Sequence, residues 1–228
     1  MPLTGDEWTA IRLTLALASV TAVLLLLVGT PLAWWLARRR GEAVAAVEAI
    51  VALPLVLPPT VLGFYLLLLF APDTPVGRGW QWLTGEQLAF SFPALVIGSV
   101  IYSLPFVVQP LQQAFQRLPG ELLEAAATLG AGPRDRFASV VLPLTRRSFL
   151  TAGALGFAHT IGEFGVVLMI GGNIPGETRV VSIALFDQVE SLQLASAHRL
   201  AGGLVACSLL LLYVLYRGGG LRPWRLGR

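Results

Sequence analysis

Long apolar stretches alternate with short polar segments along the chain. The first stretch runs from Leu13 to Leu36, 24 residues without an ionisable side chain, and about 20 apolar residues in a helix cross a hydrocarbon layer ~30 Å thick. Four further apolar stretches follow, at about residues 49–70, 93–115, 149–172 and 200–216. The pattern predicts an all-α integral membrane protein with five transmembrane helices, which form a single domain over residues 1–228.

The residues ahead of the first stretch argue against a cleaved signal peptide. Asp6 and Glu7 lie there, and no basic cluster does. A secretory signal has a basic start and a shorter apolar run, so we expect the stretch to remain as the first helix of the mature protein.

Arginine placement predicts which side of the membrane each loop faces, because short cytoplasmic loops collect positive charge. If the N-terminus is outside and the C-terminus inside, most of the 16 basic residues fall on the inner side; those left outside are Arg12, Arg78, Arg179 and Arg199. Trp34 and Trp35 precede the cluster Arg38–Arg40 and fit an interfacial aromatic belt. We therefore expect a multi-pass protein of the cytoplasmic, or inner, membrane.

Topology and contact with anionic lipid account for the net charge of +3, so we expect no nucleic-acid partner.

The composition excludes several kinds of chemistry. All basic residues except the two histidines are arginine, so the chain lacks the lysine with which a P-loop holds phosphates. Its single cysteine, Cys207, allows no intrachain disulfide and no cysteine-based zinc site, and we expect it to be a small core residue. An intramembrane hydrolase needs a nucleophile with a base or a paired metal site. We predict no catalytic residue, no metal site and no cofactor bound by this chain.

Prolines interrupt two of the apolar stretches. Pro54, Pro58 and Pro59 lie in the second stretch, and Pro105 and Pro110 lie in the third. Because proline removes a helix hydrogen bond, we expect kinks at these positions. Broken helices in a membrane are tolerated where protein or a water-filled cavity surrounds them. Pro58 and Pro59 are thus candidates for lining a translocation path, although plain packing kinks are equally compatible with the sequence.

Glu163 is the ionisable residue of the spans that most needs a partner. It follows Arg147 by sixteen positions, or ~24 Å along a continuous helix, which places it inside the apolar layer, where carboxylates are rare and usually functional. We expect it to pair with an arginine or with backbone donors, or to form part of a gate, or else to be a satisfied packing carboxylate. His159, one turn earlier on the same face, is a candidate partner; the alternative is a histidine that only packs.

Two loops are longer than simple connections, an inner one at about residues 116–147 and an outer one at about residues 173–198. The inner loop is rich in helix formers until Gly130, Gly132 and Pro133 end the run. It predicts a helical hairpin that projects from the membrane and can dock on another protein. Its spacing resembles the EAA loop of ATP-binding-cassette importer permeases, with matching residues at Glu124, Ala125, Ala126, Gly130, Leu142 and Pro143.

The resemblance extends over nearly the whole chain, to the family of molybdate permeases. It is carried by LPLVLPPTVLG at 53–63, LAFSF at 88–92, TLGAG at 128–132, GEFG at 162–165 and GNIPGETR at 172–179. The resemblance implies a type I importer permease fold and a homodimer. It also implies two cytoplasmic ATPase subunits that bind ATP and Mg and dock on the inner loops, and an external substrate-binding protein. Molybdate is the implied cargo, with tungstate or sulfate as alternatives.

The outer loop begins with a run of turn-forming residues directly after the fourth span. Backbone N–H groups of such a turn, together with an arginine, can meet an oxyanion. Candidate path or gate residues here and in the GEFG motif are Gly165, Asn173, Pro175, Gly176, Thr178 and Arg179. The other interpretation is a loop that reverses the chain or contacts the binding protein. For residues 180–197, a helix in the outer interface and a segment that dips into the dimer both remain open.

A stand-alone secondary transporter is the competing function. In it, His159 and Glu163 would relay protons, and no ATPase would be needed. The complete EAA spacing favours the ATP-driven importer.

Overall fold

The chain folds into a bundle of helices, seen in a computed structural model that describes residues 3–217. These residues form no β-strand. The helices are α1 (Gly5–Arg38), α2 (Glu42–Ala52), α3 (Pro59–Phe70), α4 (Pro75–Thr84), α5 (Phe92–Gln116), α6 (Gly120–Thr128), α7 (Pro133–Arg136), α8 (Leu142–Gly162), α9 (Gly165–Gly171), α10 (Val181–Glu190) and α11 (Leu194–Arg217), with a 3-10 turn at Leu53–Leu55 and a π-helical turn at Phe137–Val141.

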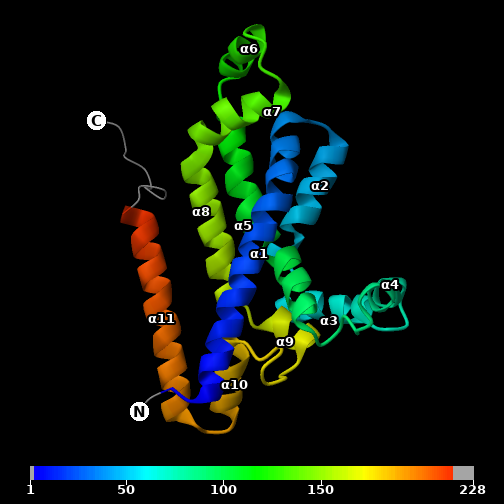
Figure 1. The fold of residues 1–228 in the computed structure, drawn as a ribbon, viewed down its shortest axis with the longest axis vertical. Coiled ribbons are helices and arrows are strands. Elements are labelled where there is room, and N and C mark those ends of the chain that lie inside the picture. The colour runs from blue at the N-terminus through cyan, green and yellow to red at the C-terminus, as the bar shows by residue number, and fades with distance from the viewer. Residues whose placement is uncertain (1–2, 218–228) are drawn as a thin grey trace.

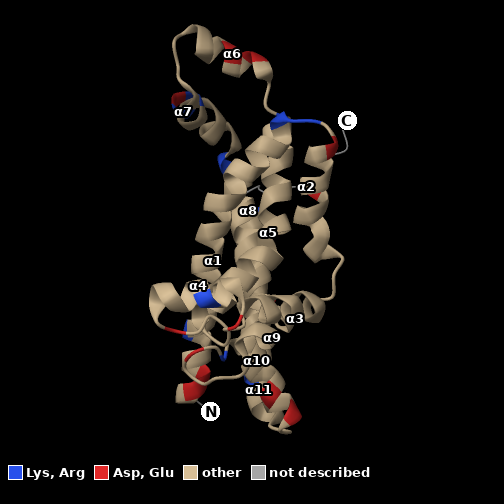
Figure 2. Ribbon diagram, turned by 90° about the vertical axis from the view of Figure 1, so that its right-hand side faces the viewer, with Lys and Arg blue, Asp and Glu red and all other residues tan. Residues whose placement is uncertain are grey.

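Within residues 3–217, three helices are long and apolar enough to cross a membrane singly, namely α1, α5 and α11. Two more crossings are bent pairs: α2 and the 3-10 turn meet α3 at 109°, and the helical segment Pro133–Gly162 meets α9 at 61°. Counting each bent pair as one span gives the five that the sequence predicts. α1 begins at one end of the bundle, and α11 starts near that end and runs toward the end at which α6 lies (Figure 1). Most charged residues lie toward these two ends (Figure 2).

The prolines of the second stretch produce a break rather than a kink. Pro54 lies in the 3-10 turn, and Pro58 precedes Pro59, the first residue of α3. In contrast, α5 continues as one helix through Pro105 and Pro110. The first position of a helix needs no N–H donor, so Pro59 suits a helix start.

Close packing of α1, α5 and α8 forms the centre of the bundle. One buried cluster lies where these helices meet α2 and the π-helical turn, and its members include Leu25, Val51, Val107, Leu111 and Phe115. A second cluster joins α1, α3, α5, α9 and α10, and it includes Leu17, Leu66, Leu95, Val166 and Ile170. Buried side chains of these sizes contribute about 1.5–3 kcal/mol each in water, whereas in a membrane close van der Waals packing carries the association.

Small residues let the central helices approach one another. A β-carbon at Gly156 of α8 would lie 2.9 Å from a methyl carbon of Val107 and 3.0 Å from one of Leu25. Glycine at such positions brings helix backbones close together, a typical feature of membrane helix interfaces. The close contact sets the spacing of the three central helices.

The start of α1 is tied to α11 by a buried carboxylate. The Thr4 N–H donates to Glu7 Oε2 at 2.7 Å and the Glu7 N–H donates to Thr4 Oγ1 at 3.3 Å, which forms a capping box. Arg199 Nη2 lies 3.1 Å from Glu7 Oε1 and forms an ion pair with it. The first turns of α11 are held in this way, and Ala197 and Leu200 are its buried residues.

The rest of α11 lies apart from the bundle (Figure 1). Cys207 is therefore exposed in this chain, and the expectation of a small core residue was wrong. The segment whose placement the sequence left open is mostly helical: α10 packs against α11 and α1 and buries Val181, Ile183 and Ala184.

Candidate functional site

The predicted docking element projects from one end of the molecule. α6 stands beyond the ends of α5 and α8 (Figure 1), and none of its residues is buried. Glu124 and Ala125 are exposed and Ala126 is half-buried. Leu129, directly after the helix, is 88% exposed. A projecting helix with an exposed leucine at its end has the form of an element that inserts into a groove of another protein.

Gly130 ends α6 with a specific cap. The Ala131 N–H donates to the carbonyl of Ala126 at 3.0 Å, and the Gly130 N–H donates to that of Ala127 at 3.0 Å. This is the Schellman pattern, which needs a left-handed residue after the helix. Gly130 has φ +87°, and an added β-carbon would meet nothing within 4 Å. Its backbone conformation, not its surroundings, therefore requires glycine there.

The return segment of the hairpin is fixed by apolar packing. Val141 is fully buried at the end of the π-helical turn, while Leu142 and Pro143 open α8 on the exposed side. Trp34 of α1 contacts Phe115 and Phe137 edge to face, at centroid distances of 5.3 and 6.1 Å. The hairpin is thereby joined to α1 and α5 as well as to α8.

Trp34 has packing contacts beyond the place in an interfacial aromatic belt that the sequence indicates. Besides these two aromatic contacts, its ring lies under the guanidinium of Arg38, 4.6 Å from the ring centroid. Its neighbour Trp35 is 39% exposed, as a belt residue should be. The sequence carries no signal for the role of Trp34, because the contacts join residues about 80 and 100 positions apart.

A hollow of about 490 Å³ opens where the two helix breaks lie. It is lined by Pro59 and Thr60 at the start of α3, by the end of α8, and by Tyr102 of α5. His159, Glu163 and Gly165 also line it. Pro59 from the motif at 53–63, Glu163 and Gly165 from the GEFG motif, and His159 thus share one cavity. Across residues 3–217, no group of three or more histidine, cysteine or acidic residues could hold a metal ion.

Glu163 lies at a break, not within a continuous helix as expected. α8 ends at Gly162, and Glu163 has extended backbone angles, φ −70° and ψ 133°. Its Oε1 accepts the N–H of Val166 at 2.7 Å, and its carbonyl accepts the Ser182 hydroxyl at 2.6 Å. Glu163 is 5% exposed, and its carboxylate caps the first turn of α9. Of the partners that the sequence left open, backbone donors are the ones found.

His159 packs and does not pair with Glu163. Its Nδ1 lies 2.9 Å from the hydroxyl of Ser103, and its ring stacks on Phe106 at 3.9 Å between centroids. Tyr102 lies on the same histidine at 4.9 Å. Of the two interpretations that the sequence left open, the packing histidine is the one found. The candidate pair with Glu163 does not form because the helix ends before Glu163, so the one-turn spacing does not hold. Sequence reasoning missed Ser103 and Tyr102, two polar residues inside an apolar span.

The two helix breaks touch through glycine. A β-carbon at Gly165 would lie 2.6 Å from the β-carbon of Pro59, and one at Gly63 would lie 2.7 Å from that of Met169. Side chains essentially never approach so closely, so both positions require glycine for α3 to pack on α9. The PP and GEFG motifs are therefore two sides of one contact.

The outer loop is a tightly bonded turn. Its N–H groups at Glu177, Thr178 and Arg179 all donate to the carbonyl of Ile174. The buried Thr178 hydroxyl donates to the carbonyl of Gly171 at 2.7 Å and accepts the Ile174 N–H at 3.2 Å. Pro175 and Gly176 form the exposed tip. These N–H groups are used within the loop, which leaves them unavailable to an anion.

Arg179 is engaged by its neighbours. Its Nε donates to Asn173 Oδ1 at 2.5 Å, and its Nη2 lies 3.7 Å from Asp187 Oδ2 of α10. Asn173 donates to the same carboxylate at 3.3 Å. The three side chains tie the loop to α10, an arrangement that supports the interpretation of a structural turn more than that of an oxyanion site.

Comparison with known proteins identifies relatives along most of the chain. The family model described as "Binding-protein-dependent transport system inner membrane component" matches residues 29–218. The Molybdenum transport system permease protein ModB of Azotobacter vinelandii is 60% identical over 216 residues, which are 95% of this chain and 96% of that protein. The protein of the same name in Escherichia coli K12 is 35% identical, over 84% of this chain and 83% of its own.

Solved structures share the fold at low sequence identity. A chain of a bacterial alginate ABC transporter, in complex with its alginate-bound periplasmic protein, matches with a TM-score of 0.71 at 16% identity, over 93% of this chain and 77% of that one. A chain of the MetNI methionine ABC transporter in an inward-facing form matches with a TM-score of 0.68 at 18% identity. The match covers 93% of this chain and 95% of that one. The architecture is thus the type I importer permease fold that the sequence predicts.

We predict that Gly165→Ala destabilises the protein whereas Gly162→Ala does not. The new methyl group at 165 would overlap Pro59, and overpacking of this kind costs about 1–3 kcal/mol. At 162 a β-carbon would meet nothing within 4 Å. Thermal unfolding of the purified variants measures the difference; equal stability of the two would contradict the close contact of the breaks.

We also predict that Glu163 acts as a helix cap. Glu163→Gln keeps an oxygen that can accept the Val166 N–H, whereas Glu163→Ala removes it at a cost of about 1 kcal/mol. Unfolding midpoints should therefore rank wild type and Glu163→Gln above Glu163→Ala. If Glu163→Gln is as unstable as the alanine variant, the negative charge rather than the capping bond is what matters.

Proposed function

Because the chain belongs to the family of binding-protein-dependent transport system inner-membrane components, we propose that it is the membrane-spanning subunit of an ATP-driven molybdate importer. Membership makes it a multi-pass protein of the inner membrane, whose partner subunit hydrolyses ATP. The proposal assigns a cargo, a set of docking residues and a path to this chain.

The observation that carries the choice of cargo is the 60% identity to the Azotobacter vinelandii protein over 95% of the chain. Relatives named for sulfate transport are more distant, such as the 33% identical protein of Zygnema circumcarinatum, of which the match covers 72%. Tungstate has nearly the size and charge of molybdate and is the hardest competitor to separate. Molybdate leads, and tungstate and sulfate are the alternatives that an experiment must compare.

The coupling loop is the proposed docking site for a cytoplasmic ATPase subunit. Its exposed α6 offers Glu124, Ala125 and the terminal Leu129 to a groove of that subunit. ATP and Mg are then bound by the partner, in agreement with the absence of lysine from this chain. Arginine placement puts the loop on the inner side, where such a partner is found.

The hollow at the helix breaks is the proposed translocation path. In one chain this hollow is partly open, so a second copy related by a two-fold axis would close it. We therefore propose a homodimer with the breaks beside the axis. Pro58, Pro59 and Gly165 form the proposed gate, where α3 and α9 can shift against one another.

The outer loop is proposed to contact the external binding protein rather than to hold the cargo. Its tip at Pro175 and Gly176 is exposed, and the ties of Arg179 and Asn173 to Asp187 keep its shape. A rigid outer turn suits a docking surface, because little entropy is lost when it binds.

Energy coupling favours this machine over a passive or proton-driven one. A dianion that enters against an inside-negative potential of ~100 mV meets about 4.6 kcal/mol, from ~2.3 kcal/mol per charge. A relay of His159 and Glu163 would need a proton path between them, yet His159 bonds to Ser103 and Glu163 to Val166. An ATPase on the coupling loop supplies the energy instead.

We predict ATP-dependent uptake of molybdate by proteoliposomes that contain this chain, its ATPase and its binding protein. Radiolabelled molybdate should accumulate with ATP but not under a pH gradient alone, and unlabelled tungstate should compete more strongly than sulfate. Accumulation without the ATPase would refute the proposed function, and stronger competition by sulfate than by tungstate would overturn the choice of cargo.

We predict that Gly130→Val separates the chain from its ATPase while Gly130→Asn does not. Asparagine tolerates the left-handed conformation, whereas a β-branched residue there costs more than the ~1–2 kcal/mol of an ordinary side chain. Copurification of the ATPase should fall at least about tenfold for valine and stay near wild type for asparagine. Membrane insertion is the control, and normal copurification with Gly130→Val would contradict the docking role of α6.

A further inference from the structure

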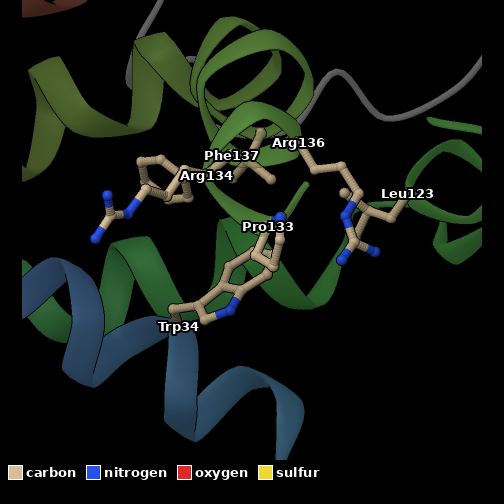
Figure 3. Close-up of a pocket in the computed structure, with 7 residues that line it drawn as sticks. Trp34, Leu123, Pro133, Arg134, Arg136 and Phe137 are labelled. Carbon is tan, nitrogen blue, oxygen red and sulfur yellow. The ribbon is translucent and has the colours of Figure 1, made fainter. Parts of the chain in front are cut away.

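A second cavity, of about 440 Å³, lies between the end of α1 and the coupling loop. Its lining includes Trp34, Leu123, Pro133, Arg134, Arg136 and Phe137 (Figure 3). It shares no residue with the hollow at the helix breaks. The cargo path therefore does not account for it.

The cavity combines apolar walls with two cationic side chains. The rings of Trp34 and Phe137, which contact each other edge to face, and the ring of Pro133 form its centre, and Arg134 and Arg136 extend to opposite sides of them (Figure 3). The Nε atom of Arg136 is buried and has no hydrogen-bond partner within residues 3–217. A buried donor of a charged group that lacks an acceptor is destabilising, so an anionic acceptor at this place would be stabilising.

The cavity lies at the level where lipid headgroups are expected. Trp34 and Trp35 mark the membrane–water interface at this end of α1, and the helix ends at Arg38. Arg38 itself lies on the Trp34 ring. Basic pockets between membrane helices on the cytoplasmic side are typical sites for anionic lipid headgroups.

We propose that this cavity binds the headgroup of an anionic phospholipid of the inner leaflet. The phosphate accepts a hydrogen bond from the guanidinium of Arg136, whose buried Nε has no other partner within residues 3–217, a charge-assisted pairing. Arg134, on the other side of the rings, adds electrostatic attraction for the headgroup. The glycerol and the first acyl carbons lie against Trp34, Phe137 and Leu123. A small free oxyanion would use the arginines but would leave these apolar walls uncovered, which is why a lipid fits better.

The position gives such a lipid a role in coupling. Phe137 begins the π-helical turn that joins the hairpin to α8, and π-turns are frequently located at functional sites. A headgroup bound between Trp34 and Arg136 links α1 to this turn. Anionic lipid therefore steadies the coupling loop, whichever oxyanion the importer carries.

The test is lipid binding by the detergent-purified, delipidated complex of this chain with its ATPase, followed by native mass spectrometry. Phosphatidylglycerol is titrated against wild type, the variant Arg134→Gln/Arg136→Gln and the control Arg39→Gln/Arg40→Gln. The control removes the same charge from exposed arginines at the same end. We expect affinity for phosphatidylglycerol to fall at least about tenfold more in the cavity variant than in the control.

Further arms distinguish a lipid site from a surface-charge effect and from a free-anion site. Phosphatidylcholine carries the same phosphate but also a cationic choline, so it should bind more weakly than phosphatidylglycerol and lose less affinity in the cavity variant. Arg136→Lys should keep part of the affinity because its charge remains. If the double variant fails to assemble, the single change Arg136→Gln takes its place. Equal losses in cavity variant and control would reduce the effect to surface charge and overturn the proposal. Displacement of the lipid by millimolar inorganic phosphate would overturn it in favour of a free-anion site.

Discussion

A helix that stops inside a hydrocarbon layer leaves backbone N–H and C=O groups without partners, and lipid supplies none. Two spans of this protein stop in this way, at Pro58–Pro59 and at Gly162–Gly165. Each break lies against the other, where Gly165 meets Pro59. At one break proline lowers the number of N–H groups that lack an acceptor. At the other break the Glu163 carboxylate accepts the N–H of Val166. Packing of α3 and α9 against α5 keeps the two breaks in contact.

Hydropathy predicts where the chain crosses the membrane but not where a crossing is interrupted. The spans and the helical hairpin follow from run length, helix formers and the glycines at 130 and 132. Glu163 was misplaced because the apolar pattern continues on both sides of it, so the sequence reads as one helix. Its capping bond to Val166 spans three residues, yet a spacing this short is also found in continuous helices.

Long-range pairs account for the other differences. Arg179 had the composition of an anion ligand, but Asp187 of α10 lies beside it and pairs with it. His159 was near Glu163 along the chain, but Ser103 on α5 is its partner in space. Cys207 was expected in the core because its neighbours along the chain are apolar. In the structure this part of α11 is exposed, and Cys207 with it. In the first two cases the deciding residue belongs to another helix, and in the third α11 lies apart from the bundle. Periodicity along one segment reveals neither.

The contacts of the coupling loop show how motion at one end can reach the breaks. The Trp34–Phe137 and Trp34–Phe115 contacts join the hairpin to α1 and α5, and α8 runs from the hairpin to Glu163. A helix transmits displacement along its axis because its backbone hydrogen bonds resist compression. Under the proposed function, a pull on α6 would therefore move the α8 side of the break contact relative to the α3 side. The hollow there has no arginine among its lining residues, and Arg179 is committed to Asp187. A path without a strong cation holds a dianion weakly, and weak binding is what release requires. Under the proposed function, selection among oxyanions would then rest with the external binding protein, while this chain would supply the gate.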